Sequence, residues 1–282
     1  MILIADSGST KTDWTLNRNG NTVKAVRTQG INPFHQQRET IMKILQKELV
    51  GAGGLEETDI QAVYFYGSGC TADQIIPMRK ALQEAIPTAK HIEVASDLLA
   101  AARALCGHEV GIACILGTGA NSCLYDGREI TANTPPLGYI LGDEGSGAAL
   151  GKLFLNGIFK GHLPADIKAC YLSETGLSYP EIIRKVYQEP LANRFLASVA
   201  RFIHHYIERQ ELQQLVIKNF VDFFDKNIEP YHQNNLKINC IGSIAFHFKT
   251  YLEIAAKQTG YYLGTVTQSP MTGLIAYHHS RT

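Results

Sequence analysis

The chain has 282 residues, of which 45% are hydrophobic and 18% are charged, enough for one large or two ordinary globular domains with buried cores. Its 26 lysines and arginines balance 26 aspartates and glutamates, and this net charge of zero argues against binding nucleic acid or an anionic membrane through a bulk field. The apolar run Met1–Ala5 stops at Asp6, too early for a signal-peptide core, and no later run approaches a membrane span, so we expect a cytoplasmic protein.

The cysteines and histidines do not form a recognisable metal site. The six cysteines include no CxxC pair, and most have apolar neighbours, as Cys114 and Cys240 do. This usage is typical of reduced, buried thiols rather than of a zinc or iron–sulfur site, which needs clustered ligands. The ten histidines include no HExxH motif, so we expect no metal held by histidine.

The first third of the chain predicts an α/β domain. The polar tip Asp6–Asp13 joins the first two of three meandering strands, and Gly30–Pro33 is the turn that follows the third. The elements expected here are strands at residues 1–5, 14–16 and 22–28, a helix at 38–50, a strand at 62–66, a helix at 75–86, a strand at 92–95 and a helix at 97–105. This order predicts an α/β domain over residues 1–107.

The opening pattern returns at Gly107, which suggests two duplicated halves that face each other. A strand at 110–116, a polar tip at 117–122 and a strand at 123–125 match the first hairpin in shape. The elements expected later are helices throughout 164–235, a strand at 238–241, a helix at 245–257, a strand at 261–263 and a last helix from Ser269-Pro270 to residue 279. We therefore predict a second domain over residues 108–269 that carries a helical insert.

The tip Asp6–Thr12 combines a carboxylate, a lysine, hydroxyl groups and a glycine on one tight turn. Such a set suits a polyphosphate, because amides and hydroxyls donate hydrogen bonds, a cation neutralises charge and a carboxylate holds water on Mg²⁺. It is not a P-loop, which needs GxxxxGK(S/T) before a helix, and alone it fits an ordinary polar hairpin equally well. A second tip, Gly117-Thr118-Gly119, makes the ordinary hairpin a weaker explanation, because a facing pair of such hairpins predicts a clamp for a nucleotide.

Two more motifs place acidic residues at the start of a helix. Ser96 is suited to cap a helix whose first turn holds Asp97, where the helix dipole favours the ionised carboxylate. A carboxylate there can take a proton from a sugar hydroxyl that attacks a γ-phosphate, with simple helix capping as the alternative. Asp143, at a helix entrance, would accept hydrogen bonds from a polyol, although Gly147 and Gly151, four residues apart, fit tight helix packing as well.

Taken in order along the chain, these motifs resemble the actin-like ATPase superfamily and, within it, the N-acetylglucosamine kinase branch of the BadF/BadG/BcrA/BcrD family. The resemblance spans nearly the whole chain, and the GDEGSG element is its most specific part. The motifs that carry it are Asp6–Thr12, Ser96-Asp97, Gly117–Asn121, Gly142–Gly147, Ile241–Ile244 and Pro270–Gly273.

The resemblance implies an α/β fold of two RNase-H-like lobes, with ATP and Mg²⁺ in the cleft between them and the last helix, residues 270–282, in the first lobe. The implied reaction transfers the γ-phosphoryl group of ATP to the 6-hydroxyl of an amino sugar, with Asp97 as the general base, in a homodimer. The residues implied in phosphate binding are Ser7, Gly8, Ser9, Thr10, Lys11, Gly117, Thr118, Gly119, Gly242 and Ser243. Those implied in sugar binding are Asn32, Ser68, Asp97, Asn121, Gly138 and Asp143, and Asp6 is expected to hold Mg²⁺ through water.

The chain departs from the family beside the expected sugar. Pro135–Gly138 replaces the common Gly-Gly-Trp-Gly, so the exact sugar stays open, with glucosamine and N-acetylmuramic acid as alternatives to N-acetylglucosamine. A non-catalytic sugar or nucleotide sensor on the same fold is the remaining alternative. Activators of 2-hydroxyacyl-CoA dehydratases and ROK proteins are disfavoured, because their characteristic cysteines are missing.

Overall fold

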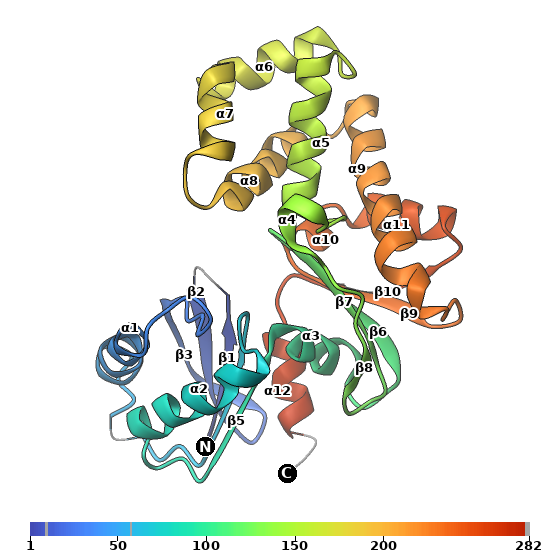
Figure 1. Ribbon diagram of the computed structural model, residues 1–282. Helices are drawn as coiled ribbons and strands as arrows, with labels where there is room; N and C mark the ends of the chain where they lie inside the picture. The colour runs from blue at the N-terminus through green and yellow to red at the C-terminus, as the bar shows by residue number, and fades with distance from the viewer. Residues whose placement is uncertain (9–10, 57, 280–282) are drawn as a thin grey trace. The chain divides into compact units, whose positions relative to one another are not determined.

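The computed structural model describes residues 1–8, 11–56 and 58–279. The chain divides into two compact units, each built on its own five-stranded sheet (Figure 1). The first unit holds Met1–Glu109, Gly127–Glu129 and the C-terminal segment from Ser269, and the second holds Val110–Asp126 and Ile130–Gln268. The α/β fold with two lobes that the sequence predicts is confirmed.

The sheet of the first unit has the strand order β3-β2-β1-β4-β5, with β1 to β3 antiparallel and β1, β4 and β5 parallel. Its strands are β1 (Ile2–Ser7), β2 (Lys11–Arg18), β3 (Asn21–Gln29), β4 (Ala62–Gly67) and β5 (His91–Ser96). Its helices are α1 (Arg38–Lys43), the π-helical η1 (Ile44–Ala52), α2 (Ala72–Ala85), α3 (Asp97–Cys106) and α12 (Met271–His279). All the strands and helices that the sequence predicts for this unit are present.

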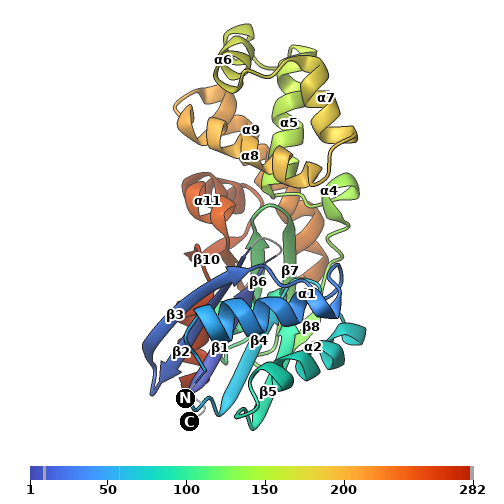
Figure 2. The same ribbon diagram turned by 90° about the vertical axis from the view of Figure 1, so that its left-hand side faces the viewer.

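Alternation along the strands gives this sheet two buried faces. Leu3 and Phe65 pack with α1, η1 and α2 on one face, which these helices cover in Figure 2. Ile4 and Tyr66, one position along, pack on the other face with α3 and with Leu274 of α12. The last helix of the chain therefore completes the core of the first unit.

The sheet of the second unit has the order β10-β9-β6-β7-β8, the same arrangement of an antiparallel hairpin beside parallel strands. Its strands are β6 (Gly111–Leu116), β7 (Ala120–Tyr125), β8 (Ile130–Ala132), β9 (Lys237–Ile241) and β10 (Tyr262–Thr267). Its helices are α4 (Gly138–Leu141), α5 (Gly147–Lys160), α6 (Ala165–Thr175), α7 (Tyr179–Tyr187), α8 (Ala192–His205), α9 (Gln210–Phe223), the π-helical η2 (Phe224–Ile228), the 3₁₀-helical η3 (Glu229–Tyr231), α10 (Ser243–His247) and α11 (Lys249–Gln258). No helix of the described residues is long and apolar enough to cross a membrane.

Two local expectations for the second unit are wrong, and two short elements were not predicted. β7 begins at Ala120, because residues 120–122 pair with the end of β6 despite their small and polar side chains, so the tip is only Gly117–Gly119. The helix expected at 245–257 is two helices, because Phe248 between them has φ −107° and ψ 25° and turns its ring into the core. β8 and α4 were not predicted, since each is only three or four residues long.

A buried polar cluster fastens α12 to the first sheet. The Tyr66 hydroxyl lies 2.8 Å from Nε2 of His278 and accepts a hydrogen bond of 2.7 Å from the Arg103 guanidinium. Arg103 also pairs with Glu93 on β5, and its guanidinium lies 5.1 Å from the ring centre of Tyr277. The cluster joins β4, β5, α3 and α12 inside one unit.

The glycines at the start of α5 serve helix packing. A Cβ atom added at Gly151 would lie 2.0 Å from the carbonyl oxygen of Leu196 on α8, and one at Gly147 would lie 3.1 Å from Cβ of Ala197. The tight packing considered for these two residues as an alternative is therefore observed.

We expect Gly151→Ala to destabilise the second unit by about 1–3 kcal/mol, the usual range for forcing extra volume into a packed contact. The added methyl group would meet backbone, which cannot rotate away as a side chain can. Urea unfolding followed by circular dichroism measures the loss. Asn156→Ala, at an exposed position of the same helix, is the control and should be neutral. Equal stability of the Gly151→Ala variant and the wild type would contradict the packing described here.

Candidate functional site

The carboxyl ends of the parallel strands in the first unit form one edge that carries most of the predicted residues. Ser7 of β1 pairs in register with Gly67 of β4, and Gly67 pairs with Ser96 of β5. Because the three strands stop at the same level, Asp6 and Ser7, the loop after Gly67 and the start of α3 at Asp97 meet there. These residues belong to separate motifs in the sequence, and the register of β1, β4 and β5 brings them together.

Ser7, predicted to bind phosphate, is buried and engaged inside the protein. Its hydroxyl lies 2.6 Å from the Thr12 hydroxyl, donates to the carbonyl oxygen of Ile31 at 2.8 Å and accepts from the Ile31 amide at 3.1 Å. Ser7 thus fixes the turn that leads into Asn32. Its side chain serves to position this turn, and no hydroxyl hydrogen is left for a phosphate.

Asn32 and Ser68 lie on neighbouring loops at this edge. The Ser68 amide donates to the carbonyl oxygen of Ser7 at 3.1 Å, and a Cβ atom added at Gly69 would come within 2.1 Å of Oδ1 of Asn32. The same Oδ1 accepts a hydrogen bond from the Phe34 amide at 3.0 Å. The Ser68 hydroxyl oxygen is buried without a hydrogen-bond partner among the described residues. A buried hydroxyl in this position fits a polar ligand that supplies the missing bond.

The carboxylates of Asp6 and Asp97 repel each other in a poorly solvated place. Desolvation, with the negative charges of Asp97 and Asp13 added to it, raises the pKa of Asp6 to about 7. Burial also raises the pKa of Asp97, although the backbone N–H groups at the start of α3 oppose this. Ser96 caps α3 as predicted, with its hydroxyl accepting from the Leu99 amide at 3.2 Å. The start of the helix favours the ionised form of Asp97, as expected, but desolvation outweighs this effect and raises the pKa.

In the rest of the first tip, the Gly8 amide donates to the carbonyl oxygen of Lys11 at 3.0 Å. Lys11 is exposed and forms an ion pair of 2.5 Å with Asp13, which Arg27 approaches to 2.7 Å. Desolvation opposes them, but the hydrogen bonds from Lys11 and Arg27 lower the pKa of Asp13. Ser9 and Thr10, also predicted to bind phosphate, lie outside the described residues.

The second tip is held by the first turn of α5. The amides of Gly147 and Ala148 donate to the carbonyl oxygens of Gly117 and Thr118 at 2.8 and 3.1 Å. Ser146 caps the helix by accepting from the Ala149 amide at 3.0 Å. The orphan amides of this helix end therefore fix the tip itself.

Asp143 lies against the same tip. Its Oδ1 accepts a hydrogen bond of 3.3 Å from the Ala120 amide, and a Cβ atom added at Gly119 would lie 3.0 Å from its Oδ2. Burial raises the pKa of this carboxyl group. Asp143 has φ +55°, which is unusual outside glycine and sets its side chain toward β7.

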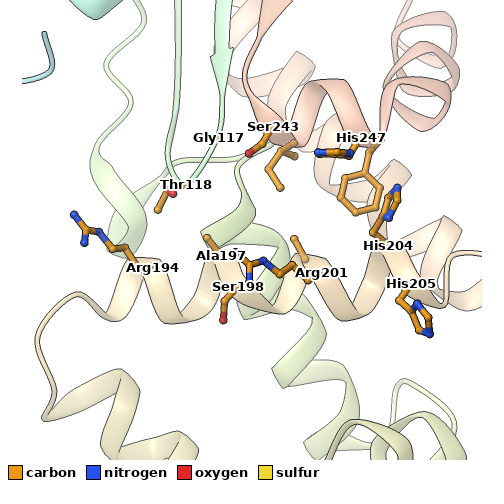
Figure 3. A pocket seen from close by; sticks show the side chains of 13 residues that line it. Gly117, Thr118, Arg194, Ala197, Ser198, Arg201, His204, His205, Ser243 and His247 are labelled. Atoms are coloured by element: carbon orange, nitrogen blue, oxygen red, sulfur yellow. The ribbon is translucent and has the colours of Figure 1, made fainter. Parts of the chain in front are cut away.

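A cavity of about 640 Å³ opens beside the second tip (Figure 3). Three of the predicted residues line it, namely Gly117, Thr118 and Ser243, and Gly242 precedes Ser243 with φ +119°. A Cβ atom at Gly242 would lie 2.4 Å from the carbonyl oxygen of Leu116, so only glycine lets these two strand ends approach so closely. Asn121 and Gly138 do not line this cavity: Asn121 accepts from Asn133 on the sheet, and Gly138 begins α4.

Most of the lining residues were missed by the sequence analysis, which treated α8 only as part of a helical insert. They are Arg194, Ala197, Ser198, Ala200, Arg201, His204 and His205 of α8, followed by His247 and Phe248. Figure 3 shows the α8 side chains in a row opposite Thr118 and Ser243. A signal exists, because Arg194, Ser198, Arg201 and His205 recur at spacings of four, three and four, opposite the buried stripe that includes Val199 and Ile203.

With this geometry known, comparison with solved structures identifies the family. A Porphyromonas gingivalis protein that bears the provisional name N-acetylglucosamine kinase is 50% identical, with 99% of each chain covered and a TM-score of 0.96. This chain belongs to the same family of ATP-dependent sugar kinases.

Two more distant structures share the fold of this sugar kinase. A Chromobacterium violaceum protein of the same provisional name is 18% identical, with 98% of this chain and 99% of that chain covered and a TM-score of 0.71. A ROK-family glucokinase from Streptomyces griseus, solved with glucose and AMPPNP, is 15% identical, with 98% and 97% covered and a TM-score of 0.55. No family model and no curated protein sequence matches the chain.

The pKa of Asp6 generates a prediction about stability. In the unfolded chain this carboxyl group ionises near its usual value of 3.8, whereas in the folded protein it stays protonated up to about pH 7. Stability should therefore fall as pH rises from 4 toward 7, since the unfolded state loses its proton first. Asp6→Asn removes this penalty, so the gain in Tm of this variant over the wild type, measured without Mg²⁺, should be several degrees larger at pH 8 than at pH 5.

The control is Asp73→Asn in the first turn of α2, whose pKa is lowered by hydrogen bonds from Thr71 and Gln74. Its effect should not change between pH 5 and 8, because both states are ionised throughout this range. A constant difference in Tm between Asp6→Asn and the wild type would show that Asp6 is ionised normally.

Proposed function

We propose that this protein transfers the γ-phosphoryl group of ATP to the 6-hydroxyl of N-acetylglucosamine. The observation that carries the proposal is the 50% identity, over 99% of each chain, to a protein provisionally named for this activity. The geometry supports it, because a desolvated carboxylate, Asp97, lies at the same sheet edge as Asn32 and the unpartnered Ser68 hydroxyl. Membership of the BadF/BadG/BcrA/BcrD branch, a homodimer and action in the cytoplasm belong to the same proposal.

Asp97 is assigned as the general base. A carboxylate at its ordinary pKa is a weak base near neutrality, and desolvation strengthens it by raising that pKa. Proton removal from the sugar hydroxyl by Asp97 then accompanies attack on the γ-phosphate, whose other oxygens are held by backbone and cationic groups. Asn32 and Ser68 orient the sugar so that its hydroxyl meets this carboxylate. Asn121, Gly138 and Asp143 are assigned to the sugar as well, from the second unit.

The residues present fit Mg²⁺ at Asp6. A carboxylate that is desolvated and repelled by Asp97 and Asp13 gains from a nearby cation, which relieves both effects. The described residues include no group of three or more acidic, histidine or cysteine side chains suited to a metal, so the ion would take its other ligands from water and phosphate. When bound, Mg²⁺ neutralises charge on the β- and γ-phosphates.

The substrate is tested with ATP and Mg²⁺ in a coupled assay of ADP release. The panel is N-acetylglucosamine, glucosamine, N-acetylmannosamine, N-acetylmuramic acid and glucose, with phosphorus NMR to locate the new phosphoester. The highest kcat/KM should be for N-acetylglucosamine, with phosphate on the 6-oxygen. A higher value for glucosamine or N-acetylmuramic acid would assign the enzyme to that sugar, and binding of sugar or nucleotide without turnover would favour the sensor.

Asp97→Asn should reduce kcat by about 10²–10⁴-fold, the usual effect of removing a general base, while ATP affinity changes little. Turnover and nucleotide binding are measured on the same preparation. Asp73→Asn is the matched control, because Asp73 is also an acidic residue in the first turn of a helix of the first unit. Turnover of Asp97→Asn within threefold of wild type would reduce Asp97 to a helix-start residue.

A further inference from the structure

The polar side chains that line the cavity beside α8 are basic or carry a hydroxyl group, and none is acidic. Among the described residues that line it are two arginines, three histidines and three hydroxyl side chains, and no carboxylate or side-chain amide. Its charge suits a polyanion. Carboxylate and amide side chains, which accept hydrogen bonds from the exocyclic amino group of a base or from ribose hydroxyls, are missing from this lining.

One end of the cavity is built from rings. The exposed ring of His204 lies 5.4 Å from that of His247, centre to centre, with an interplanar angle of 71°. The ring of Phe248, which is buried in the core, supports His204 from 5.4 Å at an interplanar angle of 82°. Figure 3 shows the rings of His204 and His247 at the end of α8 away from Thr118. Ring faces stack on any nucleobase, because every base has a π-face.

The other end is suited to phosphates. Gly117, Thr118 and Ser243 converge there from the ends of β6 and β9. Arg201 lies on α8 between the two ends, as Figure 3 shows, and no carboxylate of the described residues pairs with it. A guanidinium without a protein counter-charge is available to neutralise a polyphosphate.

We propose that this kinase recognises its phosphoryl donor through charge contacts with the triphosphate and through stacking on the face of the base. It therefore uses GTP, CTP and UTP nearly as well as ATP. Large discrimination arises where a site leaves its own buried polar groups unpaired with the wrong ligand. Stacking on a base and neutralising a triphosphate leave no buried polar group unpaired when the base changes, so neither interaction discriminates strongly between nucleotides. That the bound nucleotide donates a phosphoryl group rests on the proposed function. That the cavity binds the four nucleotides rests on the cavity alone.

Binding is measured without sugar, by displacement of a fluorescent ATP analogue with ATP, GTP, CTP and UTP in the presence of Mg²⁺. The four dissociation constants should agree within about tenfold, and initial rates with N-acetylglucosamine should follow them. Binding of ATP more than 100-fold tighter than each of the others would overturn the inference, as would the absence of nucleotide binding. Equal binding of the four without turnover of any sugar would sustain this inference while the proposed function fails.

Arg201→Ala should weaken all four nucleotides by a common factor of about 10–100, as expected for losing a hydrogen bond to a charged group. Arg209→Ala is the matched control, because Arg209 lies outside the cavity and pairs with Asp166 at 2.7 Å. It should leave all four affinities unchanged. A loss confined to ATP in Arg201→Ala would mean that Arg201 reads the base, which contradicts the proposal.

Discussion

The site of the first unit depends on one constraint, the parallel register that ends β1, β4 and β5 at the same level. This register places two carboxylates, Asp6 and Asp97, where neither is well solvated, and their repulsion gives the edge its electrostatic character. It also brings the loop after Gly67 within reach of β1, so that Ser68 bonds the backbone of Ser7. A shift of one residue in any of the three strands would separate these groups and turn their side chains to the opposite face.

The two units use similar hairpins in different ways. In the first, the Ser7 hydroxyl at the end of β1 bonds both the amide and the carbonyl of Ile31, and so fixes the turn that leads into Asn32. In the second, the tip after β6 is fixed by the backbone amides of α5, which donate to Gly117 and Thr118. The amides at the start of α5 thus hold the second tip at the end of a buried strand.

Much of the fold could be predicted from the sequence, because alternation and helical spacing are strong along most of the chain. The start of β7 was misjudged, since Ala120, Asn121 and Ser122 have weak strand preference and pair only because β6 is beside them. The pKa of Asp97 and the buried role of Ser7 depend on residues far along the chain. The stripe on α8 has helical spacing, but spacing alone does not tell which polar face lines a cavity and which faces water.

The cluster of Tyr66, Arg103 and His278 attaches α12 to the first unit, and this affects the order in which the two units can complete their folding. α12 is synthesised after the whole second unit, yet Leu274 belongs to the same buried cluster as Ile4 and Ala100 in the first unit. A nascent chain that has released its first 109 residues therefore carries a sheet with one face incompletely covered, and it keeps that apolar face until the ribosome has translated the whole second unit. Completion of the first lobe therefore follows translation of the second unit, and a chain cut short before α12 exposes a surface suited to chaperone capture.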